Sequence, residues 1–381
     1  RRFQKNQNDC VFTVLSLLPT LEEQILNEFD IEADWEKLQK TRDLEKKLRE
    51  ESKKEKELKN SVISLDTSVD SLSSLSQSEE FLLVLDKKQK QIIWENIKTK
   101  SFVRTFVSLY CMTLLTLLSH IQLNLLGRFT YISSVSALNE SEPAIQLQHE
   151  GQQADEEYLN PQVKRMFLSS SWWLLHCGWK KCTQRVQKVV DEYVSSITLQ
   201  SSLNYYDTQE LLHKLRQSIE YEECDLPISY REWMLPDTEE EELEYLKETG
   251  FEMDNETSTI ALRKLLDETK DYIDSPDFQR VLDSCLDEVF ATFNQNTFGH
   301  SLLPNLEAGV SCIKEVSSAE AQIIEQEKSV TLAKILPVMS SQAHLVFAGN
   351  EYLNGFTHTK ELEMFCAMIY TQYDKELDAL K

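Results

Sequence analysis

The sequence predicts an all-α protein, an elongated single-domain helical bundle built around one long, buried central helix. It holds only 8 glycines and 8 prolines in 381 residues, against average usage of roughly 7% and 5%, which leaves few of the turns that β-sandwiches and barrels need. Apolar residues recur at helical spacing along much of the chain. Between Arg104 and Arg128, 23 residues carry no formal charge, and 14 of them are Phe, Val, Leu, Ile, Met, Cys or Tyr.

The uncharged stretch between Arg104 and Arg128 is long enough to cross a bilayer. It also contains His120, Gln122 and Asn124 within five residues. Such side chains are costly beside lipid but are readily hydrogen-bonded inside a helical bundle. We therefore expect the central helix of a soluble body, not a membrane span.

The other elements follow from apolar spacing and breaker residues. A first helix begins near Cys10, and Pro19 is expected to end or kink it before a second segment that reaches Phe29. Residues 35–59 are dense in Lys and Glu with a sparse leucine stripe, which indicates a mostly solvated helix. Order is expected to resume at residue 81 and to run to residue 126. Later helices are expected from residue 161 and over residues 186–199, 208–221, 258–273, 277–293, 317–336 and 360–377.

Three polar segments are predicted to interrupt this body. Residues 60–80 are rich in serine and lack aromatic residues, which is typical of a flexible linker. Residues 133–160 contain Pro143, Gly151 and many Gln and Glu residues, which indicates an inserted polar loop. Residues 237–256 carry ten acidic residues against one lysine, which predicts a solvated acidic loop or a frayed helix.

Charge and cysteine usage narrow the function class. The formal charge of −24 argues against nucleic-acid binding, because phosphate contacts need clustered Lys and Arg. Eight cysteines spread along the chain suit reduced thiols in a cytosol-facing protein better than a disulfide framework. The first residue is Arg1, so we expect an amino-terminal segment to precede this sequence in the full protein.

The sequence contains no Gly-rich phosphate loop, no nucleophile elbow and no paired-His zinc motif. The strongest metal candidate is the segment HCGWKKC, in which His176, Cys177 and Cys182 supply three possible zinc ligands. No second ligand pair lies nearby, so packing inside a helix explains these residues better. We expect no metal, no cofactor and no enzymatic activity.

The segment KKQKQIIWENIKTK is the most suggestive binding motif. On a helix Lys90, Trp94 and Lys98 follow one another at i,i+4 spacing, with Ile93 and Ile97 alongside. Such a face suits an amphipathic helix that brings apolar side chains on one side and carboxylates on the other. The spacing alone favours the alternative that Trp94 and the isoleucines enter the core while the lysines are solvated.

Several segments resemble, in order and spacing, the peroxisomal biogenesis factor three family, also called peroxin three. They are FQKNQNDCVFTVLSLLPTL, IIWENIKTKSFVRT running into HIQLNLLGRFTYI, LLDETKDYIDSPDFQRVLDSCLDEVF and SVTLAKILPVM. The segment SWWLLHCGW is more similar to fungal members. The resemblance implies a cytosol-facing, all-α, single-domain body. It also implies attachment to the peroxisomal membrane by an amino-terminal anchor outside this sequence, with possible transit through the endoplasmic reticulum.

The resemblance also implies a partner. Members of the family dock peroxin nineteen, a soluble carrier of newly made peroxisomal membrane proteins, by taking its amino-terminal amphipathic helix into a hydrophobic groove. The positions of this sequence that match the family's groove are Lys90, Ile93, Trp94, Ile97, Lys98 and Lys334. The implied function is therefore a docking receptor for membrane-protein insertion and peroxisome biogenesis.

Three other functions remain open at the level of sequence. One is an organelle tether or adaptor, because fungal relatives also attach factors of peroxisome inheritance and selective autophagy. Another is a membrane-active protein in which the stretch between Arg104 and Arg128 meets lipid. The third is an unrecognised enzyme that uses Cys177 and Cys182.

Overall fold

The computed structural model describes residues 2–61, 85–140, 160–251, 256–299, 302, 329–356 and 359–372. Its strands β1 (Ser202–Leu203) and β2 (Val330–Thr331) form one short antiparallel pair. The helices of the described residues include α1 (Arg2–Glu28), α2 (Glu32–Ser61), α4 (Lys87–Glu140), α6 (Pro161–Ser169), α7 (Ser171–Trp173), η1 (Leu174–Gly178), α8 (Trp179–Val194), α9 (Tyr205–Glu220), α10 (Arg231–Met234), α11 (Glu239–Glu248), α12 (Glu256–Ile273), α13 (Pro276–Asn294), η2 (Gln295–Gly299), α16 (Leu332–Ala348), α17 (Asn350–Phe356) and α18 (Lys360–Thr371). The predicted all-α fold class is confirmed.

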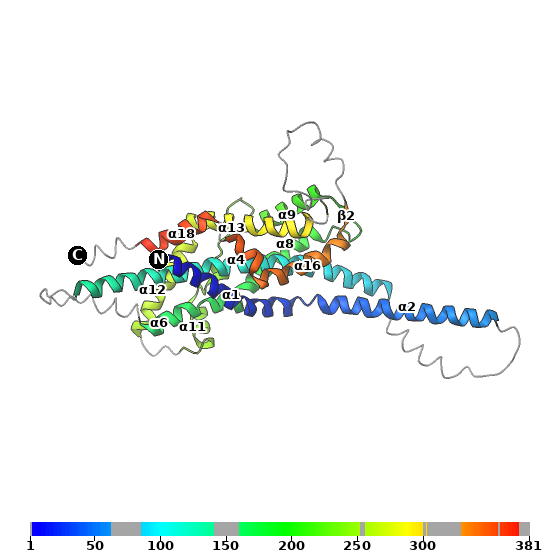
Figure 1. The fold of residues 1–381 in the computed structure, drawn as a ribbon, viewed down its shortest axis with the longest axis horizontal. Coiled ribbons are helices and arrows are strands. Elements are labelled where there is room, and N and C mark those ends of the chain that lie inside the picture. The colour runs from blue at the N-terminus through cyan, green and yellow to red at the C-terminus, as the bar shows by residue number, and fades with distance from the viewer. Residues whose placement is uncertain are drawn as a thin grey trace, which may run out of the picture.

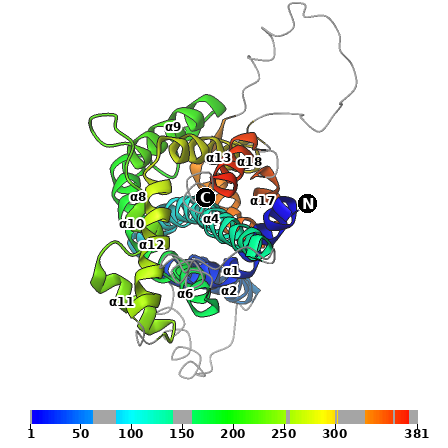
Figure 2. The same ribbon diagram turned by 90° about the vertical axis from the view of Figure 1, so that its left-hand side faces the viewer.

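Helix α4 runs through the centre of an elongated body (Figure 1), and the other helices surround it when the molecule is viewed along its length (Figure 2). It contacts α1, α8, α13, α16 and α18. By composition one window of α4 is apolar enough to cross a membrane, yet every residue of that window is buried inside the protein. The predicted long, buried central helix is therefore confirmed.

Two amide side chains inside the apolar stretch of α4, those of Gln122 and Asn124, hydrogen-bond to groups outside α4. Gln122 donates hydrogen bonds to the carbonyl of Phe167 (3.0 Å) and to Oγ of Ser170 (2.9 Å). The side-chain oxygen of Asn124 accepts a hydrogen bond from Asn6 of α1 (3.0 Å). A buried amide without such partners would be costly. These contacts explain why the stretch belongs inside a protein bundle.

Helix α1 is continuous through Pro19, so of the two alternatives, an end or a kink, the end at this residue was wrong. Pro19 is exposed, and the buried residues of α1 are spaced three or four apart on both sides of it. This stripe consists of Cys10, Val14, Leu18, Leu21 and Ile25. Its packing against α4 outweighs the hydrogen bond that a proline removes from a helix interior.

Half of the predicted acidic segment, residues 237–256, is helical, because α11 occupies Glu239–Glu248. The hydroxyl of Thr238 accepts from the backbone N–H of Glu241, and the Glu241 carboxylate accepts from the backbone of Thr238, which completes a capping box. Carboxylates in a first turn also interact favourably with the helix dipole. Of the two alternatives, the loop was wrong for these residues, because the cap at Thr238 stabilises a helix in spite of the dense negative charge.

The two other predicted polar segments lie mainly outside the described residues. Residues 62–80 of the predicted linker and residues 141–159 of the predicted loop are not described. Residues 60–61 still belong to α2, and residues 133–140 continue α4 as helix, so the predicted linker and loop were wrong for these residues. The described part of the helix predicted over residues 317–336 holds β2 and the beginning of α16. Pairing of β2 with β1 explains why that helix starts only at Leu332.

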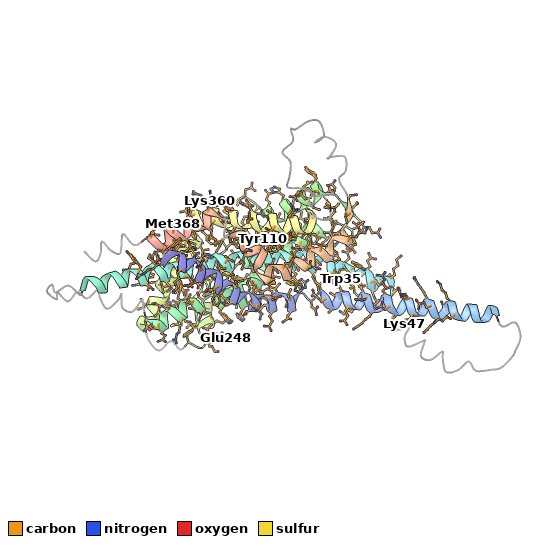
Figure 3. The ribbon with its side chains drawn as sticks, in the orientation of Figure 1. Trp35, Lys47, Tyr110, Glu248, Lys360 and Met368 are labelled. Atoms are coloured by element: carbon orange, nitrogen blue, oxygen red, sulfur yellow. The ribbon has the colours of Figure 1, made fainter. Side chains whose placement is uncertain are left out.

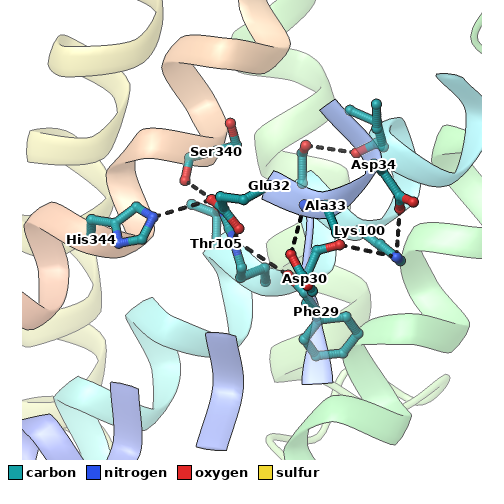
Figure 4. A network of polar contacts seen from close by, with 12 residues as sticks. Phe29, Asp30, Glu32, Ala33, Asp34, Lys100, Thr105, Ser340 and His344 are labelled. Atoms are coloured by element: carbon teal, nitrogen blue, oxygen red, sulfur yellow. Dashed lines mark hydrogen bonds and ion pairs between the residues drawn. The ribbon is translucent and has the colours of Figure 1, made fainter. Parts of the chain in front are cut away.

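Two ion pairs fix the junction between α1 and α2 to the central helix (Figure 4). The fully buried guanidinium of Arg104 binds both carboxylate oxygens of Glu32 (2.7 and 3.0 Å) and the carbonyl of Ser340 in α16 (2.9 Å). One turn earlier, Nζ of Lys100 pairs with Asp34 (2.7 Å). The junction therefore determines where α2 begins relative to α4.

We expect Glu32→Gln to lower the free energy of unfolding at pH 7 by about 2 kcal/mol, since it leaves the buried charge of Arg104 without its carboxylate. This is less than the roughly 3–5 kcal/mol of a fully buried pair, because the Glu32 side chain is 56% exposed. Burial raises the pKa of Glu32, but the hydrogen bond and charge of Arg104 outweigh burial and lower the pKa from its ordinary 4.5 to about 2.

The sign of the pH dependence follows from this lowered pKa. The stabilisation by Glu32 is complete above about pH 4.5 and is lost as the pH falls towards 2. Urea unfolding followed by circular dichroism at pH 7 and pH 3 should show a smaller difference between wild type and Glu32→Gln in acid. The control is Glu36→Gln, which removes an exposed ion pair with Lys40. Equal losses in both variants would contradict the role of Arg104.

Candidate partner-binding site

The first turns of α4 present Trp94 and Lys90 to helix α2. The Trp94 and Trp35 rings meet edge to face, with centroids 5.0 Å apart and planes at 84°. One helical turn before Trp94, the ammonium group of Lys90 pairs with the carboxylate of Glu45. Both tryptophans remain half-buried. An aromatic pair and a charge pair therefore join the two helices side by side.

Helix α2 reaches this position through a narrow apolar stripe. Trp35 and Leu38 pack against the core, and the residues that follow are mostly charged. Figure 3 shows Trp35 where α2 still lies along the body and Lys47 farther out, where the helix extends away. The pKa of Glu45 is lowered because Lys90 donates a hydrogen bond to its carboxylate and adds positive charge. We call Lys90, Ile93, Trp94, Trp35 and Leu38 together the Trp94 face.

Two of the predicted groove residues lie beneath this face. Ile97 is fully buried, and Lys98 is only 1% exposed. The ammonium group of Lys98 donates to the carbonyl of Ile197 (2.8 Å) and pairs with Glu95 (2.6 Å). Ile93 is half-buried against the core. In this structure Ile97 and Lys98 support α4 from inside, whereas Lys90, Ile93 and Trp94 reach the surface.

Lys334 comes from a distant part of the sequence but lies near the same end of the body. The loop after α8 links the two lysines. Its Ile197 carbonyl accepts the hydrogen bond from Lys98, and its Leu199 carbonyl accepts one from the backbone N–H of Ala333 in α16 (3.1 Å). The first turn of α16 therefore lies against the same loop as Lys98. The side chain of Lys334 is exposed in that turn.

Helix α2 also belongs to this face, although its sequence pattern predicts only a mostly solvated helix. The available signal is a tryptophan and a leucine at i,i+3 spacing at the start of an otherwise charged helix. Ile92 lies outside the predicted site, and the structure agrees. Ile92 is 60% exposed, and it lies about 200° around the helix from Trp94, so it faces away from the Trp94 face.

The candidate zinc ligands have other surroundings. His176 stacks on Trp172 with ring centroids 4.7 Å apart, and Nδ1 lies 3.0 Å from the Trp172 carbonyl. Cys182 is buried beside Cys111, and burial raises its pKa well above the ordinary value. Among the described residues, no three His, Cys, Asp or Glu side chains converge to hold a metal ion. Packing thus accounts for His176 and Cys182.

We expect Trp35 and Trp94 to be energetically coupled. In a double-mutant cycle, Trp35→Ala and Trp94→Ala should together destabilise the protein by less than the sum of the single changes, with a coupling of about 1 kcal/mol from the edge-to-face contact. Urea unfolding of the four proteins measures this quantity. The control pair is Trp94→Ala with Trp172→Ala, whose effects should add because Trp172 stacks on His176 instead. Additivity in both cycles would refute the contact.

Comparisons with known proteins place this chain in a family. The family model described as Peroxin-3 matches residues 1–372. "Peroxisomal biogenesis factor 3" of Yarrowia lipolytica is 25% identical over 98% of this chain and 88% of its own length. The mouse protein of the same name is 25% identical over 97% and 82%. "Peroxisomal membrane protein PEX3" of Komagataella phaffii is 32% identical over 59% and 49%. The chain therefore belongs to the Peroxin-3 family of peroxisome biogenesis factors.

Proposed function

We propose that this protein is a docking receptor on the cytosolic face of the peroxisomal membrane that binds the amphipathic helix of peroxin nineteen through the Trp94 face. Membership of the Peroxin-3 family and the names of its relatives support the peroxisomal setting. The finer assignment, to one partner and one face, rests on the resemblance of the segment around Trp94 to the family's groove and on the contacts that its residues make.

The observation that carries the proposal is the way in which α4 already holds a helix of its own chain. At the Trp94 face, α2 supplies an aromatic ring to Trp94 and a carboxylate to Lys90. An amphipathic helix with apolar residues on one side and carboxylates on the other would offer the same two contacts. The rings of Trp94 and Trp35 are only half-buried, so part of each ring is exposed where α2 and α4 meet. The partner helix would lie over these exposed parts.

Charge supports an acidic partner. The protein as a whole carries a formal charge of −24, yet residues 87–104 hold six basic residues and one acidic residue. Lys98 and Arg104 of this segment are buried, and Lys90 and Lys100 pair with carboxylates, so the exposed positive charge comes mainly from Lys87 and Lys88, with Lys334 added from α16. Exposed positive charge on a negative body attracts an acidic helix and speeds its association. Lys90 and Lys334 are the basic members of the predicted site that reach the surface.

The proposed mechanism is recruitment. The contacts of Lys98 and Ile97 hold the start of α4 in place. Because Trp94 sits on this helix and not on a loop, binding does not have to order a loop, which would cost conformational entropy. Docking of the loaded carrier would bring the apolar segments of its cargo close to the membrane. A site with few aromatic and aliphatic anchors supplies affinity while remaining reversible.

We expect Trp94→Ala to weaken binding of a peptide that spans the amino-terminal helix of peroxin nineteen by about 2 kcal/mol, or roughly thirtyfold in Kd, because a buried aromatic anchor is lost. Isothermal titration calorimetry measures the affinity, and circular dichroism checks the fold. The matched control is Trp172→Ala, which removes a half-buried tryptophan outside the Trp94 face and should leave binding unchanged. Unaltered affinity in Trp94→Ala would overturn the site assignment.

The basic residues should act mainly on the association rate. We expect the double variant Lys90→Gln, Lys334→Gln to slow association with the same peptide several-fold and to flatten its dependence on salt, since steering by charge is screened. Stopped-flow fluorescence over a range of salt concentrations tests this. The control is Lys360→Gln, which removes an exposed charge on α18, away from Trp35 in Figure 3. A salt dependence identical in all three proteins would speak against steering by these lysines.

A further inference from the structure

A groove of about 730 Å³ lies between α9 and α13. Its apolar lining comes from Leu212 of α9 and from Phe290 and Ala291 of α13. Leu212 and Phe290 are nearly fully buried, whereas Ala291 is exposed at the rim. Figure 1 shows the two helices near one another on the side of the body away from α2. This cavity shares no residue with the Trp94 face.

Polar bridges span the groove. Near the start of α9, Gln209 donates a hydrogen bond to Asn294 of α13 (2.5 Å), and the Asn294 amide donates to the hydroxyl of Tyr205 (2.9 Å). Farther along, the guanidinium of Arg216 reaches Asp287 (2.8 Å). These hydrogen bonds join the ends of long side chains. They hold α9 and α13 at a fixed separation, and the groove lies between the two helices.

The charges around the groove are not balanced. Arg216 binds Glu220 through Nε (2.7 Å) and Nη2 (3.2 Å) while it also pairs with Asp287. Asp283 lies one turn before Asp287, and its pKa is raised by burial and by the Asp287 charge. Asp225 adds a further exposed carboxylate to the lining. Among the residues that line the groove, one guanidinium thus faces three carboxylates, those of Glu220, Asp225 and Asp287.

The groove also combines this negative charge with an apolar floor. The guanidinium of Arg216 lies over the Phe290 ring at 4.8 Å, and the small exposed edges of Leu212 and Phe290, with Ala291 at the rim, form the apolar surface below the carboxylates. A ligand that only carried positive charge would leave this floor uncovered. A ligand that fits both features brings an apolar side chain next to a lysine or arginine.

We propose that the α9–α13 groove is a docking site for a basic amphipathic segment of a partner protein. An apolar side chain of the segment lies over Leu212 and Phe290, and its cationic side chains pair with Asp287 and Asp225. The charge complementarity carries this choice of partner, because a further cation relieves the excess of carboxylates around Arg216. The groove therefore selects a partner of the opposite charge to the one that suits the Trp94 face.

The probe for this proposal is a fluorescein-labelled peptide with leucines on one helical face and lysines and arginines on the other. The comparison peptide has a glutamate at every basic position. Fluorescence anisotropy with the whole chain at physiological salt should show binding of the basic peptide only. Asp287→Lys should weaken this binding at least about tenfold, because it places like charge against the ligand. Ala291→Trp should weaken it similarly by filling the groove without a change of charge.

Two controls separate the groove from general attraction to an acidic protein. Glu240→Lys makes the same charge change at an exposed residue of α11, which Figure 2 places far from α9, and should leave affinity unchanged. Trp94→Ala should also bind the basic peptide normally, so the result is independent of the proposed receptor function. Circular dichroism confirms folding, and the Asp287 side chain is already 71% exposed. Equal weakening by Asp287→Lys and Glu240→Lys, or undiminished binding by Ala291→Trp, would overturn the proposal.

Discussion

The guanidinium of Arg104 is fully buried in the middle of the molecule. The helices around it are placed so that their carboxylate and carbonyl groups can bind this charge. It donates hydrogen bonds to the carboxylate of Glu32 and to the backbone carbonyls of Phe29 and Ser340. A buried charge without such partners costs several kcal/mol. Arg104 therefore ties the end of α1, the start of α2 and the middle of α16 to one point of α4. Because α2 starts at this point, Trp35 lies against Trp94.

Helix α4 serves both as the core of the bundle and as the support of the proposed binding face. Its middle is surrounded by other helices, so it cannot tilt without disturbing many contacts. Its first turns reach the surface, where Lys98 is anchored from below by the carbonyl of Ile197. A binding residue on such an element is held in place before a partner arrives, which lowers the entropic cost of association.

Two surfaces of opposite charge character emerge on this acidic protein. The Trp94 face combines an aromatic pair with Lys90, whereas the α9–α13 groove combines the Phe290 floor with an excess of carboxylates. Electrostatic complementarity discriminates between partners more strongly than it adds affinity. Two partners of opposite charge would thus be sorted to different sides of α4 without competing for one site.

The sequence by itself determined the helical class and the buried central helix, because polar residues such as Gln122 are tolerable in an apolar stretch only within a bundle. It also determined that Lys90, Trp94 and Lys98 share one helical face. Only the tertiary structure decided that Lys98 is buried, that Trp35 packs on Trp94 and that α1 continues through Pro19. Helical periodicity tells which residues lie on the same face. Which helix covers that face depends on contacts between residues far apart in the chain, and a local pattern does not contain them.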